Sequence, residues 1–468
     1  MNGHGTLKRF QLFALRFASI VLVGLTTISL IGSAQRVMPM KLDPQMRVLL
    51  YEGPNLLLRA DQQQWMQVHG LTGGVRRLRR LQLELSQVGS SVMADLDGER
   101  RRLFKNTVLT VENNDPRGIW LGSRRYRGKF RISFFGECLQ AVNIIGIETY
   151  LTSVVGSEMP HYWPLAALQA QAVASRTYAL QQRTLREGWD VKANVTSQVY
   201  RGVEAETLRT RKAVADTQSL VLVHGDKLIN AVFHSSSGGI TEASGMVWRQ
   251  QLPYLLSVPD YDQHSPVHRW QEHFAPPYLF QLLPEIGGLH RIDVISRSAS
   301  GRVRQARLKG PLGSFVLTGQ QLRQRLGLRS TLVEFEMTSA AGQYPDAPPL
   351  VSAQQSRWLY RPSPQLVKLS FSAKVPSLLV APPPLPRTPR STAQCVLSRC
   401  GLQLVVRGQG YGHGVGMSQW GAHGLAKQGA DFRTILLHYY RGVDVTPLQA
   451  HHESALVLQP PSITRRQS

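Results

Sequence analysis

The chain contains 468 residues, of which 42% are hydrophobic, and at this length more than one domain, or a domain with insertions, is expected. Its 54 lysines and arginines against 30 aspartates and glutamates give a formal net charge of +24, which attracts the chain to polyanions. Three cysteines exclude a disulfide framework, although Cys395 and Cys400 are close enough in sequence for one local bridge.

The N-terminus has the composition of an export signal. Lys8 and Arg9 precede a mostly apolar run from Phe10 to Ile31, and the small residues at 32–34 are compatible with cleavage. The uninterrupted part of this run is short for a transmembrane helix, so residues 1–34 are predicted to be a signal peptide, with an N-terminal anchor as the alternative. We expect an exported protein of the periplasm, cell wall or extracellular space, with membrane contact at most through this segment.

Export changes the interpretation of the positive charge. A strongly basic chain usually binds nucleic acid, but this sequence has no recognised nucleic-acid-binding motif. The anionic cell wall or a membrane surface is therefore the expected polyanion, and nucleic acid is not an expected partner.

Strand-like patterns dominate the first part of the exported chain. Short runs such as RVLLYE at 47–52 and NTVLTVE at 106–112 are separated by Gly, Asn and Asp, which predicts a small β-rich N-terminal domain over 35–115. Cys138 has apolar neighbours and is expected to be a buried strand residue. Further strands lead from about 118 to a helical segment, and hairpin-like strands return at 219–235, so the predicted fold class is α+β.

A single carboxylate, Glu158, is placed at the break between an apolar segment and an Ala-rich helix. Met159, Pro160 and an aromatic pair at 162–163 follow it, so its surroundings should be apolar enough to raise its pKa and keep it protonated near neutrality. A general acid needs this property. The alternative is that Glu158 caps a helix end or forms an ion pair there.

The helix after Glu158 is predicted from strong helix formers between Pro164, which fits a first helical position, and Leu180. Arg176 lies on a semi-buried face of this helix, where an arginine needs an anion, while Tyr178 points elsewhere. Arg176 is therefore predicted to orient or stabilise charge at the site. The alternative is that it ties two elements of the fold together.

The second chemically informative stretch is RGQGYGHGVGMSQWGAHG at 407–424. Its alternating glycines allow the backbone to approach a ligand closely, with a few large side chains projecting from it, and this pattern suits a sugar-binding groove. The spacing does not fit a phosphate-binding loop. Metal binding by His413 and His423 is a weak signal without nearby Cys or clustered acids.

Together these stretches resemble the SpoIID/LytB family, the stage II sporulation protein D and amidase-enhancer proteins of bacterial cell walls. The resemblance covers about 120–335 and 400–445. The similar segments occur in the family's order and are SEMP at 157–160, PLAALQAQAVASRTYAL at 164–180, SQVYRG at 197–202, FHSSSGGITE at 233–242 and GQGYGHGVGMSQWGA at 408–422.

Enzymatic members of this family are lytic transglycosylases that act on peptidoglycan strands without stem peptides, so the resemblance implies that Glu158 is the catalytic acid. A single carboxylic acid can protonate the glycosidic oxygen between N-acetylmuramic acid and N-acetylglucosamine and then accept the proton of the muramyl C6 hydroxyl. The product is a 1,6-anhydromuramyl end. The alternative is a non-catalytic glycan-binding protein that recruits or stimulates an N-acetylmuramoyl-L-alanine amidase.

The expected catalytic residues are Glu158 and Arg176, with Arg176 contacting Glu158 or the muramyl carboxylate. Some family members hold zinc through a Cys and a His at positions that match Ser197 and Gly202 here, so no metal or other cofactor is expected. The expected substrate-binding residues are Tyr178, Tyr200, Ser235, Ser236, Ser237, Gly238, Tyr411, His413, Met417, Gln419 and Trp420.

The family-like region is predicted to be split in the sequence. Its first part covers 116–338 and its C-terminal part 395–450, with a Pro- and Ser-rich insertion or linker at 339–394 between them. The fold is expected to bring the Gly-rich stretch back against a glycan-binding cleft at Glu158. Residues 451–468 are predicted to be a disordered tail.

Overall fold

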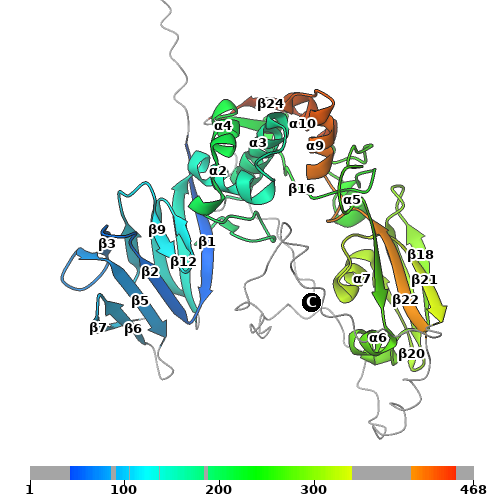
Figure 1. Cartoon of the computed structure of the whole chain (residues 1–468), viewed down its shortest axis with the longest axis horizontal. Coiled ribbons are helices and arrows are strands. Elements are labelled where there is room, and N and C mark those ends of the chain that lie inside the picture. Colours follow the sequence, from blue (N-terminus) through cyan, green and yellow to red (C-terminus); the bar gives the residue numbers. More distant parts are fainter. Residues whose placement is uncertain are drawn as a thin grey trace, which may run out of the picture. The chain divides into compact units, whose positions relative to one another are not determined.

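The computed structural model describes residues 43–85, 91–104, 106–135, 138–183, 188–339 and 402–449 (Figure 1). Apart from Asp43, these residues belong to the unit that begins at Pro44. The predicted signal or anchor, the tail and nearly all of the predicted insertion lie outside the described residues. Within the described ranges, no helix has the length and apolar character needed to cross a membrane.

The N-terminal part contains a seven-stranded sheet whose strands come from both sides of residue 115. β1 pairs antiparallel with β12, and β8 pairs antiparallel with β11, so the boundary predicted at 115 falls inside one sheet. Cys138 begins β12 and is only partly buried, although a buried position was expected. The strands in spatial order are β13 (Val191–Lys192), β1 (Gln45–Gly53), β12 (Cys138–Gly146), β11 (Lys129–Phe135), β8 (Leu109–Glu112), β3 (Met66–His69) and β4 (Arg76–Leu78).

A six-stranded sheet completes the N-terminal part, coloured blue to cyan in Figure 1. Its strands alternate: Leu56 and Leu58 are buried, whereas Leu57 and Arg59 face solvent. This period of two is the pattern of a sheet with one core face and one solvated face. The strands in order are β10 (Arg124–Tyr126), β9 (Ile119–Leu121), β2 (Asn55–Arg59), β5 (Arg80–Leu85), β6 (Ser91–Leu96) and β7 (Glu99–Phe104).

A group of helices follows, and α3 is at its centre because it contacts each of the other four. Its Ala-rich sequence suits this position, since small side chains allow neighbouring helices to approach closely, and 12 of its 17 residues are buried. The helices are α2 (Ile147–Glu158), α3 (Leu165–Gln181), α4 (Leu208–Asp216), α9 (Gln419–Lys427) and α10 (Phe432–Tyr439). A small sheet accompanies them, with β14 (Leu220–His224) between β15 (Lys227–Leu228) and β24 (Asp444–Pro447).

The third part, called here the C-terminal β region, consists of residues 269–339 and 402–409 and has its own hydrophobic core, to which Phe274, Leu322 and Leu404 contribute. The sequence did not indicate this region as a separate body. Its first sheet has the order β17 (Arg269–Phe274), β22 (Leu402–Gln409), β21 (Leu332–Ser339), and its second the order β18 (Arg291–Arg297), β19 (Val303–Gly310), β20 (Gly313–Thr318). The helices are α6 (Pro276–Leu282) and α7 (Gly319–Leu326).

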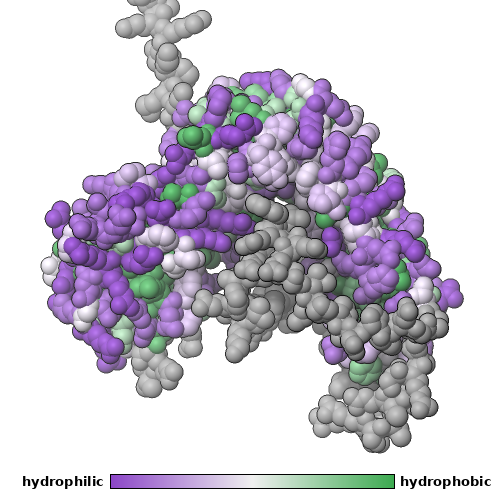
Figure 2. Space-filling view, viewed as in Figure 1, coloured by the Kyte–Doolittle hydropathy of each residue, from purple (hydrophilic) through white to green (hydrophobic). Residues whose placement is uncertain are grey.

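The two strands on either side of the predicted insertion are direct neighbours. β21 and β22 pair antiparallel, and Ser339 and Leu402 are partners in the register. Residues 340–401 therefore leave and re-enter the sheet at one end of a strand pair. The coexistence of these sheets with the helices confirms the predicted α+β fold class. The face seen in Figure 2 is mainly hydrophilic over the described elements, as the charge of the chain leads one to expect.

Candidate active site

Glu158 is the last residue of α2, and the chain turns there into the loop that precedes α3. Both of its carboxylate oxygens accept hydrogen bonds. The backbone N–H of Val199 donates to Oε1 at 2.7 Å, and Nε2 of Gln419 donates to Oε2 at 3.1 Å. The acid is therefore held from two segments that are far from it in the sequence, SQVYRG at 197–202 and the start of α9.

Two opposing effects act on the pKa of Glu158. Burial raises the pKa and is the larger effect, while the hydrogen bonds from Val199 and Gln419 and the charge of Arg201 lower it. The C-terminal end of α2 also carries the negative end of the helix dipole, which disfavours a carboxylate. The net result is a raised pKa, as expected for a general acid.

Gln419 is buried and belongs to a chain of buried amides and hydroxyls behind Glu158. Its Nε2 also lies 3.5 Å from Oε1 of Gln171, whose own Nε2 donates to the hydroxyl of Ser175 at 2.9 Å. Gln198 donates to the Ser175 carbonyl at 3.1 Å and accepts from the Tyr150 hydroxyl at 3.0 Å. Because each member has a partner, this network fixes the orientation of the Gln419 amide toward Glu158.

An aromatic cluster lies at the start of α9. The ring of Trp420 is 4.6 Å from that of Trp163, and both contact His423. Burial, together with the charge of Lys427, lowers the pKa of His423 to about 4, so this imidazole is neutral near pH 7. The cluster joins α9 to the loop after Glu158, and Tyr162 next to it is 67% exposed, which leaves an aromatic face open to a ligand.

Tyr178 lies near the same segment as Val199. Its hydroxyl interacts with Ser197, its ring is 6.5 Å from that of Phe233, and burial raises its pKa. Tyr178 is half-buried, so it retains an accessible edge. Its predicted role in substrate binding stays a prediction.

Arg176 was expected to contact Glu158 or a muramyl carboxylate, but in the structure it is paired with Glu148. Its Nε and Nη2 donate to the two Glu148 oxygens at 2.9 and 2.6 Å, and Nη1 donates to the Leu220 carbonyl at 3.0 Å. The side chain is fully buried. The predicted contact with Glu158 is therefore wrong. A guanidinium that leaves water needs a carboxylate within reach, and the first turn of α2 supplies Glu148.

Tyr200 is also buried away from ligands. Its hydroxyl donates to Oδ1 of Asn143 at 3.0 Å, and its ring packs against Tyr126 and Tyr150. This position corrects the expectation that Tyr200 lines a binding groove. A tyrosine with a satisfied hydroxyl and aromatic neighbours is a core residue.

The serines of FHSSSGGITE are tied to two buried carboxylates. Ser236 donates to Asp262 and Ser237 to Asp260, and the N–H of Gly238 donates to Asp262 at 2.7 Å. All three are buried, so they are not the cleft-lining groups that were expected. Ser235 is half-buried and its carbonyl accepts from the Trp420 N–H at 3.0 Å.

The Gly-rich stretch packs against this same serine segment. β16 (Phe233–His234) pairs with β23 (Met417–Ser418), and Ser236 bridges to Tyr411. Gly410 and Gly416 have positive φ, and a Cβ at these positions would lie within 2.6 Å of the carbonyl oxygens of Ser236 and Val232, respectively. These glycines therefore serve close packing within the protein, a correction to the idea that they bring the backbone near a ligand.

The large side chains of this stretch differ in exposure. Tyr411 is 36% exposed, so a ligand can reach it. Met417 was expected to bind substrate, but it is fully buried and no ligand can reach it. Nδ1 of His413 accepts from the Val415 N–H at 3.0 Å, and the ring contacts His234 and Trp248. Burial, together with the charge of Arg323, lowers the pKa of His413 to about 4, so it is neutral near pH 7.

Of the predicted site residues, the structure thus brings Gln419 into contact with Glu158 and joins Trp420 to the loop after it. The Val199 N–H and the Gln171 side chain were missed. A backbone donor leaves no sequence signal, and Gln171 sits on an Ala-rich helix where only its burial marks it. Across the residues described, no group of three or more His, Cys, Asp and Glu is placed to hold a metal ion.

The fold and the site define an α+β protein with a hydrogen-bonded, partly buried carboxyl group, that of Glu158, at the end of a helix. Residues 136–224, which include Glu158, α3 and α4, match the family model described as Stage II sporulation protein, SpoIID. This match agrees with the resemblance to the SpoIID/LytB family that the motifs predicted.

Curated relatives agree with this assignment. Stage II sporulation protein D of Bacillus amyloliquefaciens is 28% identical over 326 residues, covering 65% of this chain and 76% of the relative. Stage II sporulation protein D of Bacillus subtilis is 26% identical over 66% of this chain and 77% of its own length. The amidase enhancer of Bacillus subtilis is 29% identical over 63% of this chain, but only 40% of its own length is matched.

Proposed function

We propose that this protein is an exported lytic transglycosylase of the bacterial cell wall. It cleaves the bond between N-acetylmuramic acid and N-acetylglucosamine in peptide-free glycan strands, with Glu158 as general acid and then general base. The observation that carries the proposal is the raised pKa of Glu158, whose two carboxylate oxygens are held by Val199 and by Gln419 of the Gly-rich stretch.

The chemistry needs one residue that alternates between two protonation states. Protonated Glu158 gives its proton to the glycosidic oxygen as the bond to muramyl C1 breaks. The resulting carboxylate then accepts the proton of the C6 hydroxyl, whose oxygen bonds to C1 and closes the 1,6-anhydro ring. Burial favours the acid form at the start, and the donors Val199 and Gln419 stabilise the carboxylate formed in the first half.

No water and no second carboxylate take part, because the nucleophile is part of the substrate. This fits a site in which the hydrogen-bond partners of Glu158 are an amide N–H and a side-chain amide. Half-buried Trp420 and exposed Tyr162, next to the buried Trp163, supply aromatic surface of the kind on which sugar rings stack.

The test is mass spectrometry of glycan products after incubation with the chain lacking residues 1–34 and with its Glu158→Gln variant. Peptide-free strands are expected to give 1,6-anhydromuramyl ends with the parent protein and none with the variant. Reducing ends would indicate hydrolysis and would overturn the proposal.

A second candidate is a glycan-binding module that recruits or stimulates an N-acetylmuramoyl-L-alanine amidase. The similarity to the amidase enhancer supports it, although this chain matches less than half of that protein. Retained glycan binding without any cleavage, together with stimulation of an added amidase, would favour this candidate.

A further inference from the structure

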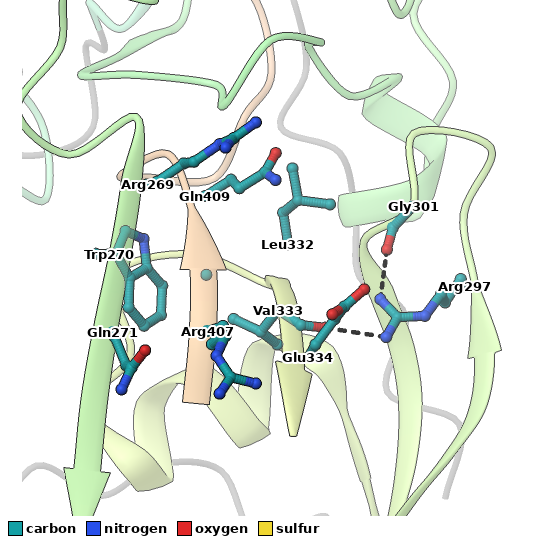
Figure 3. A pocket seen from close by; sticks show the side chains of 11 residues that line it. Arg269, Trp270, Gln271, Arg297, Gly301, Leu332, Val333, Glu334, Arg407 and Gln409 are labelled. Atoms are coloured by element: carbon teal, nitrogen blue, oxygen red, sulfur yellow. Dashed lines mark hydrogen bonds between the residues drawn. The ribbon is translucent and has the colours of Figure 1, made fainter. Parts of the chain in front are cut away.

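A cavity of about 670 Å³ lies in the C-terminal β region (Figure 3). Its floor is the sheet β17-β22-β21, and Arg297 of β18 lines it as well. None of the residues that line it is among the site residues described above. Figure 3 shows polar side chains from three neighbouring strands on the same side of this sheet.

The strand register arranges these side chains in two rows. Arg269, Gln409 and Leu332 are partners across the three strands, and so are Gln271, Arg407 and Glu334 one pleat further along. Directly paired residues, and residues two apart, project from the same face of a sheet. Neighbouring strands are about 4.8 Å apart, so the first row offers two polar groups and the second row three, at a spacing of roughly one sugar unit.

Two of the guanidinium groups carry charge that no nearby acid neutralises. Arg269 and Arg297 have no carboxylate within ion-pair distance in the part of the chain that the structure describes, whereas Arg407 is 2.6 Å from Glu336. Arg297 is fixed in place because it donates to the carbonyls of Gly301 at 2.7 Å and Val333 at 3.0 Å. An oriented arginine beside a free one suits a carboxylate ligand.

The other residues that line the cavity restrict the chemical class of ligand that it can bind. Gln271 and Gln409 offer amides, Glu334 offers an acceptor, and Leu332 gives an apolar surface. Hydroxyl and acetamido groups pair with such side chains, while Glu334 repels a polymer charged at every unit. The combination therefore fits a sugar chain with sparse carboxylates better than a phosphodiester polymer.

We propose that this cavity binds the lactyl carboxylates of peptide-free glycan strands. This inference rests on the proposed function, because the ligand is the glycan strand that the proposed reaction cleaves. When stem peptides are attached, the lactyl carboxyl is an amide and carries no charge, so arginines at this cavity distinguish peptide-free strands from intact ones. Ten residues of chain lead from Gln409 to Gln419, a reach of at most about 35 Å, so one long strand can engage the cavity and Glu158 together.

The test is the binding of fluorescently labelled peptide-free strands, followed by anisotropy, to the chain lacking residues 1–34. All proteins carry Glu158→Gln, so that binding is measured without cleavage. Three probes are compared: the strands themselves, the same strands with their carboxyls converted to methylamides, and poly(glycerol phosphate). We expect the methylamide form to bind at least about tenfold more weakly, the order of effect expected for lost charge-assisted hydrogen bonds.

Arg269→Gln with Arg297→Gln is expected to weaken binding of the unmodified strands at least about tenfold and to remove the preference for them over the methylamides. Arg304→Gln with Arg307→Gln is the matched control, because both arginines are exposed on β19 of the same region and do not line the cavity. The control pair is expected to bind within twofold of the parent, roughly the effect of a distant surface charge.

The single variant Arg269→Gln is included because replacing Arg297 could disturb the fold. Arg297 donates to two backbone carbonyls, whereas no such bond is found for the Arg269 side chain among the residues described. Equal binding of strands and methylamides, or unchanged binding in a folded Arg269→Gln variant, overturns the inference. Preferential binding of poly(glycerol phosphate) at the cavity also overturns it. The absence of cleavage by the parent protein would refute only the proposed function, because these measurements use a Glu158→Gln background.

Discussion

The side-chain amide of Gln419 donates a hydrogen bond of 3.1 Å to the carboxyl group of Glu158, and 261 positions of sequence separate the two residues. This bond opposes the effect of burial on the pKa of Glu158. Gln419 was expected to bind substrate, but its position makes it a residue that orients Glu158 and adjusts its protonation.

Gln419→Met should shift the pH dependence of cleavage. The hydrogen bond from Gln419 lowers the pKa of Glu158, so removing this donor raises that pKa. The alkaline limb of the activity profile should then move upward by roughly one pH unit. The maximal rate should fall, because the carboxylate formed in the first step loses a donor. Gln169→Met on α3 is the control, since the Gln169 amide donates to Asp216 and not to Glu158. A lower rate with an unmoved profile would contradict the assignment.

Glu158→Gln should separate activity from stability. Cleavage is expected to fall by roughly 10²–10⁴-fold, the usual contribution of a general acid. Because the folded pKa of Glu158 is raised, the contribution of this residue to stability is present in acid and is lost as pH rises through that pKa. The glutamine in the variant cannot ionise, so the melting temperature of Glu158→Gln relative to that of the parent should increase between pH 5 and pH 9. A constant difference across this range would contradict the raised pKa.

Arg176→Met should destabilise the protein through Glu148. The substitution leaves a carboxylate with 14% exposure beside an apolar group, and losing one partner of such a buried pair costs about 3–5 kcal/mol. Adding Glu148→Gln should recover much of this loss. Chemical denaturation of the two variants measures both effects. An Arg176→Met protein of full stability without activity would instead support a catalytic role.

His413 and His423 should make the fold sensitive to acid. The pKa values of His413 and His423 are lowered from 6.5 to about 4, so their stabilising contribution is present above 6.5 and is lost as pH falls through 4. Each contributes at most roughly 3 kcal/mol over this window. His413→Gln and His423→Gln should flatten the decline in melting temperature between pH 6.5 and 4. His273→Gln, at an exposed position on β17, should leave it unchanged.

Replacement of residues 340–401 by Asn-Gly should preserve the C-terminal β region. Ser339 and Leu402 are register partners, so a two-residue turn can join their strands. Shortening a connection removes about 0.6 kcal/mol of closure cost per halving, which predicts unchanged or higher stability, by up to roughly 3 kcal/mol. Unfolding curves of the two chains provide the comparison. A large loss of stability would show that the excised residues belong to the fold.

Much of the local structure could be predicted because its signals are local. The helix after Glu158 begins at Leu165, next to the Pro164 start, and ends at Gln181. The strand pattern at 47–52 lies within β1, and the pattern at 106–112 contains β8 over 109–112. The separate core of the C-terminal β region was not predicted. Its central strand β22 comes from beyond residue 401, and no local pattern indicates which distant strand will be its neighbour.

The sequence by itself determined the resemblance to the SpoIID/LytB family, the α+β class and the unusual position of Glu158, since motifs, periodicity and composition are properties of contiguous residues. Only the tertiary structure decided which polar groups meet. Arg176 pairs with Glu148 and Tyr200 with Asn143, while Gln419 reaches Glu158. Burial is the physical reason: a polar side chain that leaves water must take whichever partner the packing of distant segments places within hydrogen-bond distance.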